Sequence, residues 1–327
     1  MKQSQFTERY QLQWHQYSLQ LDALNKKKQS VAIDPRFIDK YTEICSHLAM
    51  AKERNYSIAL ISYLQDLATQ GHQFVYQRKT NAFKRSLDFI AFGFPQSFRR
   101  EWKAIFWAGL IFYGSFFLMM FLVMMDPDIA LKIQSASELE QYRQMYSPDS
   151  STLGKGAMRE HDTNFMMFGF YIFNNIGIGF VTFAMGLFFG AGSLLILLTN
   201  GLSIGTTAGY LSLYDTATPF WTFVIAHSPF ELNAIVIAGA AGFKLGWAII
   251  HPRGYSRVSA LKIQAKNSIP LMWGATFFLF IAAVIEAYWS SIGLNGLPAS
   301  IKYSVGAILW ALVIWYFIFA GRSHEVK

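Results

Sequence analysis

The sequence contains a single cysteine, Cys45, and little charge. One cysteine excludes an internal disulfide framework and is typical of a protein region in a reducing compartment. Charged residues make up 15% of the 327 residues, hydrophobic residues make up 53%, and the mean hydropathy is +0.26. A soluble domain of this length needs more charge to cover its surface. The composition therefore predicts a membrane protein that crosses the bilayer several times.

Long apolar runs are absent from residues 1–100, which instead carry most of the net charge. This part has 15 Lys and Arg against 8 Asp and Glu, a net charge of +7 out of +8 for the chain. It does not begin with a charged region followed by an apolar core, so we expect no cleavable signal peptide. No nucleic-acid recognition motif accompanies the charge. We therefore expect no nucleic-acid partner, and we attribute the charge to cytoplasmic retention and to attraction by anionic lipid.

Apolar residues in this basic head recur at intervals of three and four, which predicts amphipathic helices. Asp34 and Pro35 are typical of an N-cap and the first position of a helix, and the third stripe ends near Gly71. Segment 83–100 mixes apolar and basic residues, which predicts either a helix in the headgroup region or a fourth helix of the bundle. The three stripes are Phe6, Tyr10, Trp14, Tyr17, Leu21 and Leu24; Phe37, Tyr41, Ile44, Leu48 and Ala51; and Ile58, Ile61, Leu64 and Leu67.

Six apolar runs follow the head, each long enough to span a bilayer, which takes about 20 residues. The sequence thus predicts an all-α protein with a helical head, 1–100, and a six-span transmembrane domain, 101–321. The predicted spans are Trp102–Met125, 164–184, 187–213, 219–250, 269–291 and 301–320.

The charges of the connecting segments predict the orientation of the chain. Segment 126–163 contains 4 basic and 7 acidic residues, whereas 251–266 contains Arg253, Arg257, Lys262 and Lys266 and no acidic residue. The tail, 322–327, is also basic at Arg322 and Lys327. The positive-inside rule then places both termini and 251–266 in the cytoplasm of a bacterial cell and 126–163 outside its inner membrane.

Three consecutive spans carry polar residues at a similar depth, counted at about 1.5 Å per helical residue. Unpaired polar groups are costly in hydrocarbon, so we expect these residues to form one hydrogen-bonded cluster or to line a watery cavity. Glu286 lies nearer the end of the fifth span, and we interpret it as an interfacial residue. The predicted midplane cluster consists of Asn174, Asn175, Asn200, His227 and Glu231.

The fourth span contains a proline between the two ionisable residues of this cluster. Pro229 cannot donate its amide and clashes with the carbonyl group of Ile225, so it predicts a kink. Small residues at intervals of four on the third and fourth spans predict close helix packing, either within the chain or in a homo-oligomer. They are Gly201, Gly205 and Gly209 on the third span, and Ala234, Ala238, Gly242 and Gly246 on the fourth.

Three stretches of the transmembrane domain resemble the stage II sporulation protein M family. They are FNNIGIGFVTFAMGLFFGAGSLLILLTNGLSIG at 173–205, HSPFE at 227–231 and AGAAGFKLG at 238–246. The resemblance covers residues 100–320 and extends weakly to the head. It carries over the Asn-Asn pair, Asn200-Gly201 and the His-x-x-x-Glu motif, and departs at Ser228-Pro229, where members commonly have a glycine after the histidine.

The resemblance implies a role without naming a partner. Members in spore formers are similar to scaffolds that hold cell-wall hydrolases at the membrane during engulfment, and the long form resembles members from non-sporulating bacteria. It implies a scaffold or assembly factor for a cell-envelope complex rather than an enzyme. We expect the lipid bilayer and other membrane or envelope proteins as partners, the latter through 1–100 and 126–163.

Other function classes stay open at this point. Ionisable residues at membrane depth favour a transporter, a channel or a lipid-handling protein. A metal-dependent hydrolase needs a third ligand beside His227 and Glu231, and the sequence has no second histidine inside a span. A serine hydrolase would pair Ser193 or Ser203 with His227, yet GAGS at 190–193 is not a nucleophile elbow. We predict no bound metal because this third ligand is missing. No nucleotide-binding loop is present, so we also predict no cofactor.

Overall fold

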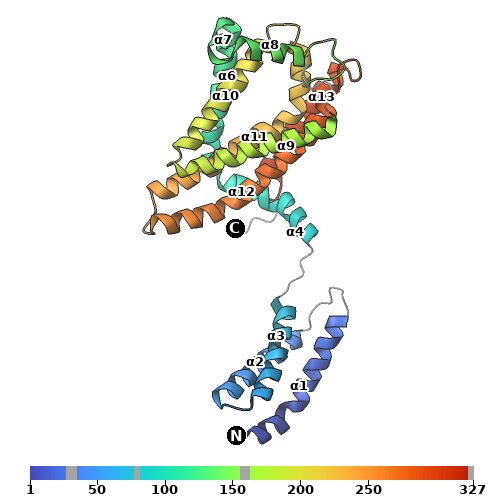
Figure 1. Cartoon of the computed structure of the whole chain (residues 1–327), viewed down its shortest axis with the longest axis vertical. Helices are drawn as coiled ribbons and strands as arrows, with labels where there is room; N and C mark the ends of the chain where they lie inside the picture. The colour runs from blue at the N-terminus through green and yellow to red at the C-terminus, as the bar shows by residue number, and fades with distance from the viewer. Residues whose placement is uncertain (27–34, 77–81, 155–162, 323–327) are drawn as a thin grey trace. The chain divides into compact units, whose positions relative to one another are not determined.

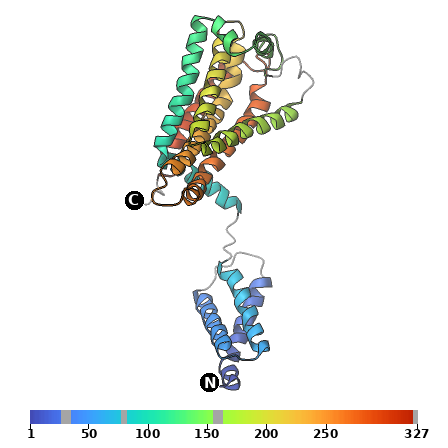
Figure 2. The same ribbon diagram turned by 60° about the vertical axis from the view of Figure 1, so that its left-hand side comes forward.

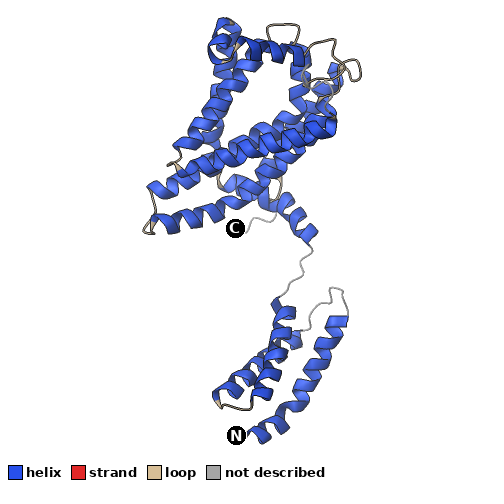
Figure 3. Ribbon diagram, viewed as in Figure 1, coloured by secondary structure: helices blue, strands red, loops and turns tan. Residues whose placement is uncertain are grey.

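The computed structural model describes residues 1–26, 35–76, 82–154 and 163–322, and these residues are almost entirely helical (Figure 3). Within these ranges there is no strand, and Thr152 and Ile292 form an isolated β-bridge. The all-α class is therefore confirmed. Contacts divide the chain into two compact units, Met1–Ser86 and Leu87–Lys327.

The core of the first unit is formed by helices α1 (Gln3–Lys26), α2 (Pro35–Glu53) and α3 (Ile58–Tyr76) (Figure 1). The predicted stripes meet in its core, where Trp14, Tyr17 and Leu64 are almost completely buried. The indole nitrogen of Trp14 donates to Nδ1 of His47 at 3.1 Å, which links α1 to α2. Apolar burial along three amphipathic stripes accounts for this unit.

Two details of the first unit bear on the predicted helix boundaries. The second helix begins at Pro35 as predicted, and Asp34 lies outside the described residues. The third helix runs past Gly71 to Tyr76, because Gly71 marks a close approach rather than a helix end. A Cβ at Gly71 would collide with the hydroxyl group of Tyr17 and would lie 2.9 Å from the ring of Tyr41.

Among its described residues, the second unit contains six helices that are long and apolar enough to cross a membrane, which confirms the predicted number. Figures 1 and 2 show how these helices are arranged. Two of them continue into tighter or wider turns: α9 into the 3₁₀ helix η3 (Met185–Leu187), and α12 into the π-helix η4 (Glu286–Ser290). The six are α6 (Trp102–Met125), α9 (Asn164–Ala184), α10 (Ala191–Leu211), α11 (Ala217–Ile250), α12 (Arg257–Ile285) and α13 (Ala299–Phe319).

Helix α12 begins twelve residues before the predicted fifth span. The basic segment, expected as a loop up to residue 266, is helical from Arg257. The hydroxyl group of Ser256 accepts a hydrogen bond from the amide of Ser259 and so caps the first turn. A polar segment beside an apolar span thus extends the same helix.

Helix α11 lies at the centre of the second unit. It contacts α6, α9, α10, α12 and α13, and its residues Ala234, Ile237, Ala238 and Ala240 are fully buried. Because five other spans pack against α11, its polar residues Thr222, His227 and Ser228 are buried among protein atoms.

Segment 83–100 forms α4 (Ala82–Asp88), the π-helix η1 (Phe89–Gly93) and α5 (Phe94–Arg100). Phe94 is fully buried against Gly274 of α12, where a Cβ would overlap its ring. Phe98 stacks on Phe317 of α13 with ring centroids 3.8 Å apart. These aromatic contacts join α5 to the other helices of the second unit, Leu87–Lys327.

The two small-residue ridges pack inside the chain. The ridge of α10 faces the backbone of α6, where a Cβ at Gly209 would lie 2.7 Å from the carbonyl oxygen of Met120. The ridge of α11 faces the turn between α9 and α10, where a Cβ at Gly246 would overlap the amide of Gly190. Side chains at these positions would force the helices apart.

Segment 126–154 packs over the ends of several spans and contains α7 (Asp128–Ile133) and α8 (Ala136–Met145). Ser135 and Glu138 form a capping box at the start of α8. The ring of Tyr146 packs edge-on against Phe220 of α11, and the amide of Leu153 donates to the carbonyl oxygen of Ser291 at 2.9 Å. This segment therefore covers the end of η4.

Candidate functional site

Three ionisable side chains meet inside the second unit. His227 and Glu231 come from α11, and Glu286 comes from the first position of η4. One imidazole nitrogen and one carboxylate oxygen from each glutamate all lie within 4.8 Å of one another. We call these three residues the His-Glu-Glu cluster. His227 is 4% exposed and Glu286 is 8% exposed, so the cluster lies among protein atoms.

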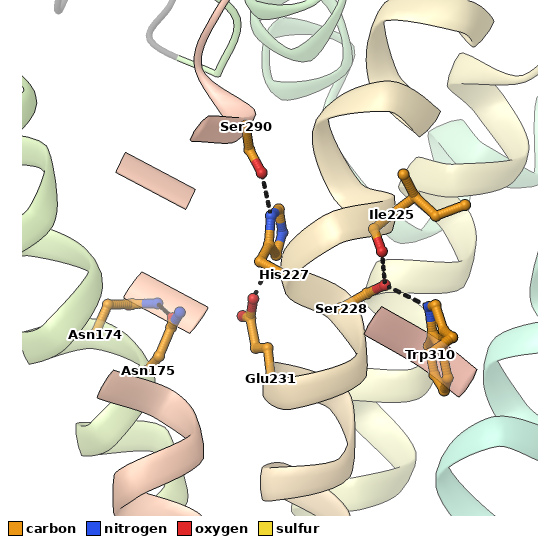
Figure 4. A network of polar contacts seen from close by, with 8 residues as sticks. All are labelled: Asn174, Asn175, Ile225, His227, Ser228, Glu231, Ser290 and Trp310. Atoms are coloured by element: carbon orange, nitrogen blue, oxygen red, sulfur yellow. Dashed lines mark hydrogen bonds and ion pairs between the residues drawn. The ribbon is translucent and has the colours of Figure 1, made fainter. Parts of the chain in front are cut away.

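His227 uses its two ring nitrogens in different directions (Figure 4). Nδ1 lies 3.0 Å from the hydroxyl oxygen of Ser290, at the last position of η4. Nε2 lies 3.7 Å from Oε2 of Glu231, one helical turn along α11. The bond to Ser290 fixes the orientation of the ring, so Nε2 points at the carboxylate of Glu231.

Glu286 is the member of the cluster that the sequence did not identify. Among the described residues, its Oε2 atom is buried and has no hydrogen-bond partner. The side chain of Asn175 on α9 interacts with the Glu286 carboxyl group. Asn174 donates to Oδ1 of Asn175 at 2.9 Å, which leaves the amide nitrogen of Asn175 as the group that can donate to Glu286.

A buried lysine fixes the end of η4. Lys302 of α13 is fully buried, and its ammonium group donates to the carbonyl oxygens of Ser290, at 2.9 Å, and of Ile292. Carbonyl groups at the end of a helix lack intrahelical partners, and a cation is a favourable donor to them. Lys302 thereby holds Ser290 in place against His227.

A second group of polar contacts lies around Pro229. The carbonyl group of Ile225, which loses its amide donor to the proline, accepts a bond from Ser228 Oγ at 3.4 Å. Trp310 of α13 donates to Ser228 Oγ at 3.2 Å (Figure 4). Asn233 donates to the carbonyl oxygen of Pro229 at 2.8 Å. With these contacts in place, α11 continues as an α-helix through Pro229.

The structure does not bring all the predicted residues together. Asn200 is half-buried on α10, and its amide donates to the carbonyl oxygen of Ile196 on the same helix at 2.8 Å. Within the described residues, no hydrogen bond links it to the cluster. Asn174 and Asn175 reach the cluster through Glu286, as described above, and not through direct bonds to His227 or Glu231.

The depth of Glu286 follows from the way the fifth span ends. The chain leaves α12 through a π-helix whose last residue, Ser290, is completely buried, and the next residue, Ser291, is covered by Leu153. The end of this span therefore lies inside the protein rather than at its surface. The sequence did contain a signal for the position of Glu286. A carboxylate in an otherwise apolar span usually faces the protein interior.

The serines considered for a hydrolase do not contact His227. Ser193 donates to the carbonyl oxygen of Thr182 at 2.6 Å, and Ser203 contacts the side chain of Gln134. The serine beside His227 is Ser290, whose complete burial leaves no room for a substrate at its hydroxyl group. The geometry gives the serine hydrolase hypothesis no support, whereas three ligand atoms around one point suit the binding of a proton or a cation.

A separate groove of about 1140 Å³ lies at the ends of α6, α11 and α12. Its charged lining includes Arg100, Lys103 and Arg253, and its aromatic lining includes Trp102 and Trp247. Lys244 forms an ion pair of 2.5 Å with Glu101 in this groove. Basic and tryptophan side chains at the ends of spans are typical of the headgroup level of a bilayer.

Comparison with known proteins identifies the family to which the chain is similar. The family described as Stage II sporulation protein M matches residues 104–291, more than half of the chain. A domain of unknown function, DUF8413, matches residues 4–77, which contain most of the head helices. An uncharacterized protein of Methanocaldococcus jannaschii is 26% identical over 117 residues, which are 35% of this chain and 66% of that protein. No solved structure matches. The family match includes the whole His-Glu-Glu cluster.

Proposed function

Because the chain belongs to the stage II sporulation protein M family, we propose that it is a scaffold or assembly factor for a protein complex of the cell envelope. The chain is a multi-pass membrane protein. Our proposal adds that it lies in a bacterial inner membrane with both termini in the cytoplasm. Its partners would be other membrane or envelope proteins, bound through the head and through segment 126–163.

Enclosure of the polar residues is the observation that carries this proposal. His227, Glu286, Ser290 and Lys302 are all more than nine-tenths buried, and the side chain of Glu231 is 20% exposed. These residues link α11, η4 and α13 through polar contacts, and Asn175 adds α9 through its interaction with Glu286. Such contacts favour one arrangement of helices, which is what a platform for partners requires. A transport path instead requires polar groups that solvent can reach.

The two regions outside the spans support a binding role. Leu12 and Leu19 lie seven residues apart on one face of α1 and are 69% and 54% exposed. Leu131 of α7 is 53% exposed. Exposed apolar side chains of this size are candidates for burial against partner proteins.

Photo-crosslinking in native membranes tests the scaffold proposal. A photoreactive amino acid is placed at Leu12, at Leu131 and, as a control, at the fully buried Leu64. We expect Leu12 and Leu131 to capture a defined envelope protein, identified by mass spectrometry, and Leu64 to capture none. Crosslinks at both exposed positions that yield lipid alone, in the cells that naturally produce the protein, would contradict the proposal.

Cysteine labelling tests the proposed orientation. In a Cys45→Ser background, single cysteines replace Ser147 in segment 126–154 and Ser256 before α12. We expect a membrane-impermeant thiol reagent to label only the cysteine at 147 in intact cells, and both cysteines after permeabilisation. Labelling at 256 in intact cells would refute the orientation.

A transport or lipid-handling function is the second candidate, and the unpartnered oxygen of Glu286 favours it. A protein that carries protons or cations across a membrane needs ionisable groups inside its spans. The two candidates differ in what Glu231→Gln does to function: a scaffold should keep its function, and a proton or cation carrier should lose it.

A further inference from the structure

We propose that His227, Glu231 and Glu286 bind one divalent transition-metal ion, with Zn²⁺ as the best-fitting ion, inside the transmembrane domain. This site goes beyond the scaffold function and does not depend on it. Four observations support it: the geometry of the ligand atoms, an unpartnered buried oxygen, the contacts that orient the ligands, and the balance of charge.

The ligand atoms are close to the separation that a metal ion requires. Zn²⁺ binds nitrogen and oxygen ligands at about 2.0–2.2 Å, which places two ligands of a tetrahedral site about 3.4 Å apart. Nε2 of His227 and Oε2 of Glu231 are 3.7 Å apart, and an oxygen of Glu286 lies within 4.8 Å of both residues' ligand atoms. To reach the tetrahedral separation, the ligand atoms would have to approach by at most about 1.4 Å, the difference between 4.8 Å and 3.4 Å.

The unpartnered oxygen is a second observation at the same site. Oε2 of Glu286 is buried, and among the described residues no donor reaches it. A buried carboxylate oxygen without a donor is strongly disfavoured, and buried polar atoms nearly always have a partner. A metal ion bound between Glu286 and Glu231 would supply that partner.

The surrounding contacts orient two ligands as the outer contacts of metal sites do. Ser290 lies at Nδ1 of His227, and with the ring proton on Nδ1 the Nε2 atom presents its lone pair to a metal. The amide of Asn175, itself held by Asn174, interacts with the Glu286 carboxyl group. Lys302 fixes the backbone of Ser290 and completes this support.

Charge balance favours a divalent ion. Two carboxylates and a neutral imidazole carry a charge of −2, and the nearby ammonium group of Lys302 is occupied by the carbonyl oxygens of Ser290 and Ile292. In a medium of low dielectric constant, two adjacent carboxylates must take up a proton or bind a cation. Imidazole and carboxylate ligands without a thiolate suit Zn²⁺ and related divalent ions rather than Cu(I).

Three protein ligands leave a coordination position for water. The ion would tie α11 to η4 at the same point where Ser290 and Lys302 already join α11, η4 and α13.

Metal analysis of the full-length protein tests the site. The protein carries a tag without histidines, is purified in lipid nanodiscs, incubated with ZnCl₂ and freed of excess metal. Elemental mass spectrometry then counts the metal bound to each chain. We expect about one Zn²⁺ per chain for the wild type and at least a tenfold loss for Glu286→Gln and His227→Gln. The matched control is Glu140→Gln in α8, whose carboxylate is 56% exposed, and it should retain the ion.

Two further measurements keep the test decisive if a variant folds poorly. Glu286→Asp keeps the carboxylate and should retain zinc with lower affinity, and each variant is compared by size-exclusion profile and circular dichroism. X-ray absorption at the zinc edge should show nitrogen and oxygen ligands at about 2.0 Å. The proposal is overturned if the wild type binds less than a tenth of an equivalent of zinc, if folded Glu286→Gln keeps the ion, or if sulfur ligation points to Cys45.

Discussion

Replacing Lys302 by methionine should destabilise the transmembrane domain, because its ammonium group is the donor for two carbonyl oxygens at the end of η4. Methionine has a similar length but no donor. The change removes this partner from the carbonyl oxygen of the buried residue Ser290 and from that of the half-buried residue Ile292. Without Lys302, the backbone of Ser290 is held by fewer contacts, so the hydrogen bond between its hydroxyl group and His227 should weaken.

The size of the effect follows from these contacts. A hydrogen bond from a charged donor contributes about 1.5–3 kcal/mol, so two bonds contribute about 3–6 kcal/mol. Replacing a buried ammonium group by an apolar side chain removes a desolvation cost, which offsets part of this loss. We expect a net decrease of about 2–4 kcal/mol in the free energy of unfolding. For a domain of this size each kcal/mol corresponds to about 2–4 °C, so the melting temperature should fall by about 4–16 °C.

Thermal unfolding in detergent, followed by circular dichroism, measures this loss. Lys132→Met in α7 is the matched control, because Lys132 is exposed, and its melting temperature should stay within about 2 °C of the wild type. If Lys302→Met melts no lower than Lys132→Met, the ammonium group does not hold η4, and the reasoning is wrong.

Three other predictions concern the cluster, the glycine ridge and the head. Without the proposed ion, Glu231→Gln should leave abundance and function nearly unchanged in a scaffold, because the amide keeps the size and much of the hydrogen bonding although one metal ligand is lost; a complementation assay in zinc-depleted medium that finds a folded variant inactive beside an active wild type would move transport to first place. Gly205→Val should lower the melting temperature by several degrees, because its Cβ overlaps the carbonyl of Phe116 on α6, whereas Gly114→Ala, where a Cβ meets nothing within 4 Å, should not. Burial beside Trp14 lowers the pKa of His47, so the folded head favours the neutral ring. The contribution of His47 to the stability of the folded head should be fully present above about pH 6.5, the ordinary pKa of histidine, and should be lost as the pH falls below it. Amide hydrogen exchange in α1 and α2 at pH 7.5 and 5.5 measures this loss of stability, and in His47→Gln the pH-dependent difference should disappear.

The fold was predictable because the bilayer restricts the choices of the chain. Backbone groups cannot stay unpaired in hydrocarbon, so each long apolar run is a helix, and six runs were visible. The stripes of the head were also readable, since Trp14 and Leu64 follow a period near 3.6. Segment 83–100 mixes apolar and basic residues, so its sequence could not distinguish a helix in the headgroup region from a helix of the head bundle. In the structure, Phe94 and Phe98 pack against α12 and α13, and these contacts fix the position of α5.

The site was predictable only in part. His227 and Glu231 share a helix face, so their proximity follows from their spacing alone. Glu286 was misjudged, because depth was counted from an end of the fifth span that is itself buried beneath segment 126–154. Asn200 shows the converse problem. A side chain at the correct depth can satisfy its amide on its own helix, as Asn200 does at Ile196, and depth does not reveal on which side of the helix it lies.

The glycine ridge of α10 has a consequence for the order in which the protein is made. Its partner, α6, ends at Met125, and α10 begins only at Ala191, so α6 enters the bilayer long before the surface that will cover it exists. The face of α6 that α10 later covers can stay in contact with lipid until α10 is made. It is apolar at Phe112, Phe116 and Met119, and its one hydroxyl group, on Ser115, already donates to the carbonyl oxygen of Phe112. The first span can therefore remain alone in lipid at little cost during synthesis, whereas α9, with Asn174 and Asn175, depends on the later arrival of η4.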